Sequence, residues 1–307
     1  MTQPATQQTP NETWTVQRLL QWTADWLTKA GSPTGRLDGD LLLAHVLRCN
    51  RLQLLLRFDQ PVQRDELAQF KQLIRRRSKL EPIAYILGRK GFHDIEINVT
   101  PAVLVPRPET EILVDDVAAY LHDARAAAGP VLDLCTGSGC IALALCRDLE
   151  KLHQDRTFWA VDLSAAALAV AQDNAVQLGR SVQWCQGDLW DALPPGCQFA
   201  VVVSNPPYVR TADWEHLDPD VKLFEPRLAL DGGRDGLDVA RRIVLSAPRH
   251  LVKGGLLALE LGDRQQGIEI AALLDQAGFK NVRSAQVHGS PTHIVTAHWT
   301  EGSDSQK

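Results

Sequence analysis

The chain has 307 residues, of which 45% are hydrophobic and 22% are charged, and its formal net charge is −5. This length allows two globular domains. No apolar window of 18 residues occurs, so we expect neither a membrane span nor a membrane partner. The six cysteines form no CxxC pair and no metal-ligand spacing. We therefore expect free thiols, no metal and a cytoplasmic location.

The first part of the chain is predicted to be helical after a disordered start. Residues 1–13 are polar and lack the basic start and apolar stretch of a secretory signal, and we expect disorder there and in residues 301–307. Apolar residues recur at helical spacing within residues 14–81. Breaks at 31–33 and 58–61 divide this region into short helices, which predicts a small helical domain.

Positive charge is concentrated in this helical region. Residues 1–80 hold 12 Lys/Arg and 7 Asp/Glu, and the run Arg75-Arg76-Arg77-Ser78-Lys79 supplies much of the excess. We interpret the run as a solvated helix face, with a docking patch as the alternative. The remainder of the chain is acidic, which is not typical of a protein that grips duplex DNA.

Residues 82–108 are predicted to form a connector that contains a β-hairpin. Hydrophobic residues alternate with polar ones in 95–99, and a second short apolar run follows at 103–105. A turn near Thr100-Pro101 would pair these two segments as antiparallel strands.

Residues 109–300 alternate between helical and strand patterns, which predicts an α/β domain with a mostly parallel sheet covered on both faces. The expected helices are 109–124, 139–150, 164–178, 235–250 and 264–277, and the expected strands are 130–134, 157–161, 181–185, 199–203, 254–260 and two near 280–298. The last two strands are separated by a short Gly-Ser-Pro turn, so we expect an antiparallel hairpin at one edge.

A glycine turn and three acidic residues at the ends of successive strands predict a nucleotide-like cofactor. The strand that contains Asp133 runs into the turn Cys135-Thr136-Gly137-Ser138-Gly139, where glycines allow close approach of a ligand. Asp162 ends the next strand and suits the ribose hydroxyls, and Asp188 follows the third strand and suits an adenine amine. Asp133 would repel a diphosphate but suits a cation. S-adenosylmethionine is therefore favoured over a nicotinamide dinucleotide.

The segment Asn205-Pro206-Pro207-Tyr208 follows the buried run 199–203 and is the most informative stretch of the chain. Two successive prolines cannot donate to a sheet, so the strand must end there with a fixed shape. The Asn205 oxygen and the Pro206 carbonyl are placed to accept the two N–H groups of a planar amide or amine, while Tyr208 covers one face. The alternative is a Pro-Pro turn beside a packed tyrosine.

These motifs resemble a known enzyme group. Asp133–Gly139, Ala160–Asp162 and Asn205–Tyr208 are similar to class I methyltransferases that modify planar nitrogens. The segments 82–88, 103–111 and 224–237 narrow the resemblance to the peptide chain release factor glutamine N5-methyltransferases, the PrmC/HemK family. The resemblance implies a Rossmann-like class I S-adenosylmethionine-dependent methyltransferase fold with a mostly parallel seven-stranded sheet, a small N-terminal helical domain and a hairpin connector.

The resemblance also implies an activity. The chain is expected to transfer a methyl group from S-adenosylmethionine to the glutamine of the Gly-Gly-Gln motif in class I release factors, leaving S-adenosylhomocysteine. The implied cofactor contacts are Asp133, Cys135, Thr136, Gly137, Ser138, Gly139, Asp162, Asp188, Leu189 and Asn205, and the implied substrate contacts are Asn205, Pro206, Pro207 and Tyr208. Asn205, Pro206 and Tyr208 are the expected catalytic residues. The helical domain would help to dock the release factor, and a monomer is the expected state.

Two alternative substrates remain open: a ribosomal protein glutamine, and an exocyclic amine of adenine or guanine in nucleic acid. The sequence also departs from the family pattern. Cys135 stands where the family has glycine, Leu189 stands near a usual aromatic position that Trp190 is expected to fill, and a basic residue is replaced around Thr292-His293. Arg107 and Glu111 are interpreted as an ion pair that fixes the connector over the cofactor, and Glu109 and Thr110 as a helix cap.

Overall fold

The structure is a computed structural model that describes residues 13–151 and 156–300, with the side chain of residue 151 left out. The disordered ends expected from the sequence lie outside these residues, apart from residue 13. The chain divides into two compact units after Leu87, and each is described by itself. No helix among the described residues is long and apolar enough to cross a membrane.

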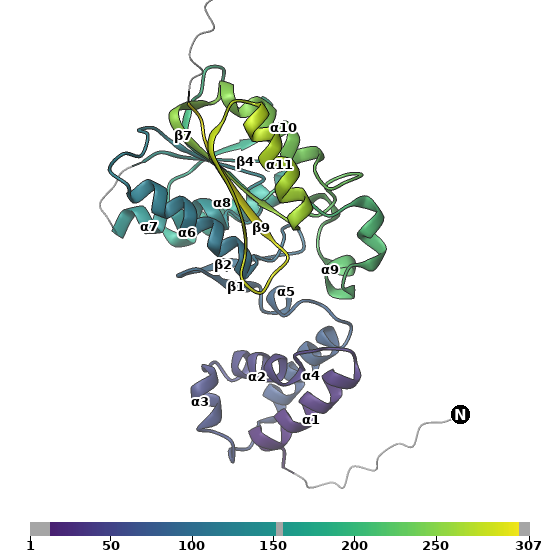
Figure 1. Cartoon of the computed structure of the whole chain (residues 1–307). Helices are drawn as coiled ribbons and strands as arrows, with labels where there is room; N and C mark the ends of the chain where they lie inside the picture. The colour runs from purple at the N-terminus through teal and green to yellow at the C-terminus, as the bar shows by residue number, and fades with distance from the viewer. Residues whose placement is uncertain (1–12, 152–155, 301–307) are drawn as a thin grey trace, which may run out of the picture. The chain divides into compact units, whose positions relative to one another are not determined.

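The N-terminal unit is a bundle of short helices, as the sequence predicts. Its helices are α1 (Val16–Lys29), α2 (Gly35–Val46), α3 (Arg51–Leu55), α4 (Arg64–Arg77) and α5 (Ile83–Leu87), labelled in Figure 1. The expected breaks fall between α1 and α2 and between α3 and α4. A shared apolar core holds the helices together, and Leu20, Leu27, Leu42 and Phe70 are almost fully buried in it.

One arginine of the basic run is buried, which contradicts the prediction of a wholly solvated face. Arg75 and Arg76 are exposed, but Arg77 is only 5% exposed. Its Nε donates to Asp38 Oδ2 at 2.6 Å, and its Nη2 lies 3.3 Å from Ser32 Oγ. An arginine is tolerated in this core because a buried carboxylate faces it. Arg77 is therefore part of the fold of the unit and not of its surface.

Replacing Arg77 with alanine should destabilise the helical unit by about 3–5 kcal/mol, since Asp38 would remain buried without its cation. Urea denaturation followed by circular dichroism measures the free energy of unfolding. Arg75→Ala, on the same helix and exposed, is the control and should change little. Equal stability of the two variants would show that the buried pair is not needed.

The second unit begins with a hairpin whose register differs from the expected one. Strands β1 (Arg89–Phe92) and β2 (Ile95–Asn98) pair antiparallel around a turn at His93, where φ is +52°. The expected pairing of 95–99 with 103–105 is wrong, because 103–105 forms no strand. Strand β1 was not predicted from the sequence, because Arg-Lys-Gly-Phe lacks the alternation of apolar and polar residues that indicates a strand. Asn174, further along the same unit, accepts from the Asn98 backbone N–H at 2.8 Å and so fixes the end of the hairpin.

A seven-stranded sheet forms the centre of this unit. Its strands are β3 (Val131–Leu134), β4 (Phe158–Asp162), β5 (Gln183–Gln186), β6 (Phe199–Ser204), β7 (Leu251–Leu261), β8 (Lys280–Gln286) and β9 (His293–His298). The order is β5-β4-β3-β6-β7-β9-β8, parallel through β7, with β9 antiparallel to both neighbours. The predicted mostly parallel sheet with a closing hairpin is confirmed.

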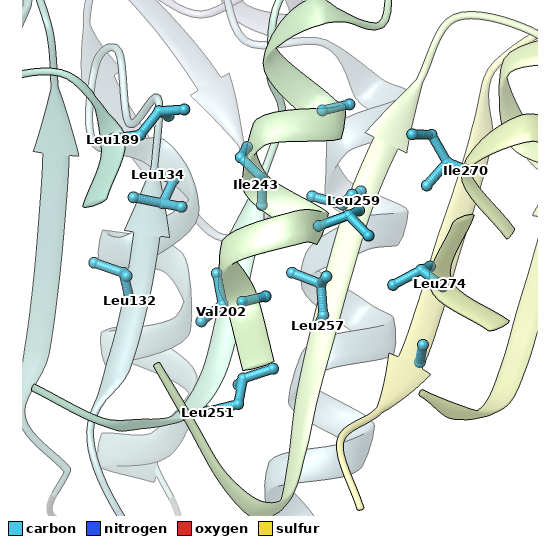
Figure 2. Close-up of a cluster of buried hydrophobic side chains, with 14 of the residues drawn as sticks. Leu132, Leu134, Leu189, Val202, Ile243, Leu251, Leu257, Leu259, Ile270 and Leu274 are labelled. Atoms are coloured by element: carbon cyan, nitrogen blue, oxygen red, sulfur yellow. The ribbon is translucent and has the colours of Figure 1, made fainter. Parts of the chain in front are cut away.

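Helices cover both faces of the sheet, as the alternating pattern predicts. They are α6 (Pro108–His122), α7 (Cys140–Lys151), α8 (Ala165–Leu178), α10 (Asp238–Ser246) and α11 (Arg264–Gln276), whereas the short helix α9 (Pro219–Phe224) has no buried residue. In Figure 1, α6, α7 and α8 lie on one side of the sheet and α10 and α11 on the other. Figure 2 shows Ile243 of α10 and Ile270 of α11 packed over leucines of the strands, such as Leu257 and Leu259.

The strand order places a topological switch point next to β3. The chain runs from β3 outward to β4 and β5, and then returns to the other side of β3 for β6. Connections leave the carboxyl ends of β3 and β6 in opposite directions, which opens a crevice between them. The glycine turn follows β3 and Asn205 follows β6, so the fold brings the two main motifs of the sequence together.

Candidate functional site

A cavity of about 350 Å³ lies at the carboxyl edge of the sheet. Residues that follow β3, β4, β5 and β6 line it, as expected for a parallel sheet with a switch point. Among the residues predicted from the sequence, the lining includes Cys135, Thr136, Gly137, Ser138, Asp162, Asp188, Leu189, Asn205 and Pro207. The structure therefore collects in one cavity groups that are up to 72 positions apart in the chain, from Cys135 to Pro207.

Four residues of the predicted site are not part of the lining. Asp133 is fully buried behind the glycine turn, where its Oδ2 accepts from Thr136 Oγ1 at 2.6 Å. Gly139 packs inward, since a Cβ there would lie 3.1 Å from Ala171. Pro206 is buried, and the Tyr208 ring lies against Gly262, so neither is among the lining residues. Asp133 and Gly139 therefore support the turn from behind, whereas Pro206 and Tyr208 flank Pro207, which does line the cavity.

The turn after β3 has an unusual backbone that favours glycine. Cys135 has φ +59° and Gly137 has φ +56°, so both adopt the left-handed conformation. A residue with a Cβ is strained there by about 1–2 kcal/mol, whereas glycine is not. The Cys135 side chain is tolerated because it is small and half-buried at the cavity.

Exchanging Cys135 tests this strain directly. Glycine relieves the left-handed backbone but gains freedom in the unfolded chain, so Cys135→Gly should change the free energy of unfolding by less than about 1 kcal/mol. Cys135→Val places a β-branched side chain in the same conformation and should lose more than about 1 kcal/mol. Chemical denaturation of both variants gives the comparison. A valine variant as stable as the glycine variant would contradict the account.

Asp162 is held in place by the backbone of the turns on either side of it. Its Oδ2 accepts from the Gly137 N–H and its Oδ1 from the Ser164 N–H, both at 2.8 Å. Burial raises the pKa of Asp162, while these backbone hydrogen bonds lower it. Each carboxylate oxygen keeps a lone pair for a further donor. Asp162 is thus a rigid double acceptor on the cavity wall, which suits vicinal hydroxyls.

Asp188 has a partner that the sequence did not indicate. Arg242, from α10, donates to Asp188 Oδ2 at 2.8 Å, and both residues line the cavity. The adjacent Leu189 has φ +50° and lines the cavity as well. Trp190 does not fill the expected aromatic position. It is 9% exposed and stacks on His250 with ring centroids 4.5 Å apart.

Asn205 sits between two acceptors at the end of β6. Its Nδ2 donates to Glu260 Oε1 at 2.9 Å and to Thr110 Oγ1 at 3.1 Å. Thr110 is therefore a partner of Asn205, whereas the sequence suggested a helix cap. Glu260, fully buried on β7, was missed, although one acid within an apolar strand run is a signal of function. With both N–H groups engaged, the Asn205 oxygen is the polar atom left to meet a ligand.

The chain after Asn205 is fixed by a buried glutamine. Gln266 Nε2 donates to the Tyr208 carbonyl at 2.8 Å and to the Asp235 carbonyl at 3.1 Å, and its Oε1 accepts from the Gly262 N–H at 2.9 Å. The Tyr208 carbonyl also lies so close to Gly236 that a Cβ there would be 2.2 Å away. One side chain thus joins the Pro-Pro segment, the end of β7 and the loop of residues 231–237, which is called the glycine-rich loop below.

Two loops that are distant in sequence form the rim of the cavity. Ala102, Val103, Leu104, Pro106 and Arg107 contribute from the connector, and Pro226, Leu228 and Ala229 from the loop after α9. Arg107 Nη2 donates to Glu225 Oε1 at 2.5 Å, and Glu225 Oε2 accepts from the Val105 N–H at 3.3 Å. The prediction that Arg107 forms an ion pair with Glu111 is wrong. Arg107 does fix the connector, but it does so through Glu225.

Replacing Arg107 with leucine should destabilise the protein by about 3–5 kcal/mol at pH 8, because Glu225 would be a buried carboxylate without its cation. Burial already raises the pKa of Glu225, and loss of Arg107 raises it further. Between the unfolded and folded pKa values, the folded variant binds a proton that the unfolded chain does not bind. The stability of the variant should therefore rise as the pH falls from 8 towards 5.

Urea denaturation across this pH range measures the effect of Arg107→Leu. Arg125→Leu is a suitable control, because Arg125 pairs with Asp123 at the surface and is 90% exposed. The control should keep nearly the stability of the unchanged protein at each pH. A stability of Arg107→Leu that falls with decreasing pH would contradict the assignment.

The cavity fits S-adenosylmethionine better than a dinucleotide. Its lining offers the double acceptor Asp162, the carboxylate of Asp188 and exposed turn backbone. Asp133 behind the turn has a buried Oδ1 that finds no hydrogen-bond partner in the described part of the chain, and burial raises the pKa of Asp133 to about 7. A buried carboxyl disfavours a bound diphosphate at this turn and tolerates a cationic ligand. Among the described residues, no His/Cys/Asp/Glu cluster has metal-binding geometry.

Comparison with known proteins gives relatives along almost the whole chain. Family models described as the PrmC N-terminal domain and the methyltransferase small domain match residues 18–88 and 109–218. The release factor glutamine methyltransferase of Geobacter sulfurreducens is 42% identical over 275 residues, covering 90% of this chain and 93% of that protein. That of Vibrio cholerae is 37% identical over 289 residues, covering 93% and 97%.

A solved structure shares the fold of a large part of this chain. A methyltransferase from Pyrococcus furiosus aligns with a TM-score of 0.50 at 18% identity and covers 69% of this chain and 92% of its own. At this identity the likeness shows the fold alone. It agrees with the class I methyltransferase fold expected from the motifs.

Proposed function

Because this chain belongs to the release factor glutamine methyltransferase family, we propose that it methylates the side-chain amide nitrogen of the Gly-Gly-Gln glutamine in class I release factors. The methyl donor is S-adenosylmethionine. The observation that carries the proposal is the Asn205 amide, whose nitrogen is engaged by Glu260 and Thr110 and whose oxygen is left for a donor at the cavity. A glutamine NH₂ group is such a donor.

The cofactor would be held by the residues around the glycine turn. Asp162 would accept from the ribose hydroxyls, Asp188 and Leu189 would contact the adenine, and the backbone of 135–138 would meet the remaining polar groups; all of these residues line the cavity. When bound, S-adenosylmethionine supplies an electrophilic methyl group on a sulfonium that leaves as S-adenosylhomocysteine. Asp133 and Gly139 contribute by shaping the turn from behind.

The protein's own part in the transfer is positioning. An amide nitrogen is a weak nucleophile because its lone pair is delocalised into the carbonyl. The Asn205 oxygen and the Pro206 carbonyl would each accept one substrate N–H, which fixes the nitrogen for attack and stabilises the positive charge that develops on it. The nitrogen would form a bond to the methyl carbon that S-adenosylmethionine supplies while the bond from that carbon to sulfur breaks, and the nitrogen would release one proton to solvent. Tyr208 and Pro207 limit the freedom of the amide.

The proposal also includes how the release factor docks, and the oligomeric state and location of the protein. The helical N-terminal unit helps to hold the release factor, and Arg75, Arg76 and Lys79 are the members of the basic run that are exposed for this. The protein acts as a monomer in the cytoplasm on a protein substrate. The domain limits inferred from the sequence, 14–81, 82–108 and 109–300, stay a prediction, and the structure divides once, after Leu87, inside the expected connector.

Methyl-labelled S-adenosylmethionine tests the substrate when it is incubated separately with a class I release factor, ribosomal proteins and DNA. We expect label only in the release factor, on the Gly-Gly-Gln glutamine, as located by mass spectrometry. A release factor with that glutamine changed to alanine is the matched control. Label in ribosomal protein or in DNA, with none in the release factor, would replace the proposal with one of the alternatives.

Asn205→Ala should lower turnover on release factor by roughly 10²–10³-fold, equivalent to about 2–4 kcal/mol, because it removes an acceptor that acts on the transition state. Steady-state kinetics give the loss, and thermal denaturation shows whether the variant is folded. A folded Asn205→Ala enzyme with near-normal turnover would exclude the proposed role of this side chain.

A further inference from the structure

We propose that Glu260 is the positioning residue that orients the Asn205 amide, so that its oxygen and not its nitrogen faces the substrate. This inference rests on the proposed function and adds the reason why the site selects an NH₂ group. An asparagine amide can be turned over with little change in shape, and only its hydrogen-bond partners decide which end points where. The partners of Asn205 are therefore part of the recognition of the substrate.

The geometry identifies Glu260 as the deciding partner. Its Oε1 accepts from Asn205 Nδ2 at 2.9 Å, shorter than the 3.1 Å from Nδ2 to Thr110 Oγ1. A threonine hydroxyl both donates and accepts, so Thr110 suits either orientation of the amide. An ionised carboxylate only accepts, so it admits only the orientation in which the Asn205 nitrogen points towards Glu260.

Glu260 is also rigidly held. It lies on β7 within the apolar run Leu256–Leu261, and it is fully buried. Its register partner on β9 is Ile294, and its Oε2 has no hydrogen-bond partner among the described residues. A buried carboxyl without full hydrogen bonding is costly to stability, which points to a role in function.

The orientation has a consequence for substrate choice. An acceptor oxygen at the cavity binds the NH₂ group of glutamine, whereas it repels the carboxylate of glutamate, which can only accept. If the Asn205 amide were turned over, its NH₂ group would favour the carboxylate instead. Glu260 thus makes the site select glutamine over glutamate, although it does not line the cavity itself.

The charge state of Glu260 should control this selection. Burial raises the pKa of Glu260 to about 7, with Glu109 raising it further and Arg107 and the hydrogen bonds from Thr110 and Asn205 lowering it. Tyr208 and Cys140 also face this carboxyl, and both remain neutral near pH 7 because burial raises their pKa. Above about pH 7 the carboxylate only accepts. Below it, the protonated carboxyl donates to the Asn205 oxygen and permits the reversed amide.

Glu260→Gln tests the proposal with little change in shape, and Thr110→Val is its matched control. Turnover on release factor is measured from pH 5.5 to 9, alongside S-adenosylmethionine affinity by calorimetry and stability by thermal denaturation. The unchanged enzyme should lose activity below about pH 7. Glu260→Gln should be roughly 10- to 100-fold slower above pH 7, the size expected for a hydrogen bond to a charged group, and should lack this pH limb.

Thr110→Val should be slower but should keep the pH limb, because Glu260 still titrates. A second measurement uses a release factor whose Gly-Gly-Gln glutamine is changed to glutamate. This glutamate variant of the release factor should bind the unchanged enzyme more weakly than the native release factor does. In the Glu260→Gln enzyme the difference in affinity between the two release factors should be smaller. Cofactor affinity should stay within about twofold in both variants, since neither side chain is proposed to hold the ribose or adenine.

Two results would overturn the role of Glu260. One is a folded Glu260→Gln enzyme with unchanged rate and pH profile. The other is a slower enzyme that keeps the pH limb and the preference for glutamine, which is the result of a purely structural residue. If Glu260→Gln does not fold, a flat pH profile of the unchanged enzyme from 5.5 to 9 overturns it as well. Failure of the proposed function looks different, since the unchanged enzyme would then leave release factor unlabelled.

Discussion

The hydrogen bond from Asn205 to Glu260 connects the ends of two neighbouring strands at the centre of the sheet, and the site depends on it. It joins the carboxyl group of Glu260 on β7 to Asn205, the residue that follows β6. The strand residues around this contact are fully buried. In such surroundings an amide and a carboxyl can persist only if they satisfy each other. The same hydrogen bond fixes the orientation of the Asn205 amide, so this one contact contributes both to stability and to recognition of the substrate.

The cofactor side of the cavity is preorganised in a similar way. Backbone N–H groups hold both oxygens of Asp162, and Asp133 holds the turn from behind through Thr136 and the Ala142 N–H. The left-handed backbone at Cys135 is retained because these contacts over-determine the turn. The groups that meet a ligand are therefore held by rigid neighbours, which lowers the entropy lost on binding.

Charged and polar side chains join the loops around the cavity through contacts between residues that are distant in the chain. Arg107 and Glu225 tie the connector to the loop after α9, and Gln266 ties the Pro-Pro segment to the glycine-rich loop. Each of these side chains is buried or partly buried and contacts a segment at least 31 positions away in the chain. The loops that surround the reaction centre are in this way fixed to the sheet and to one another.

Local patterns in the sequence determined the alternation of helices and strands, the glycine turn, the acids that end the strands and the Pro-Pro segment, because each is set by periodicity or backbone chemistry within a few residues. Tertiary structure alone decided the partners. Arg107 pairs with Glu225 and not Glu111, Trp190 packs on His250, Arg77 is buried, and β1 pairs with β2. Glu260, Gln266 and Arg242 gain their roles from neighbours far along the chain. Local sequence specifies which groups are available, but burial and the meeting of distant strands decide which of them satisfy one another.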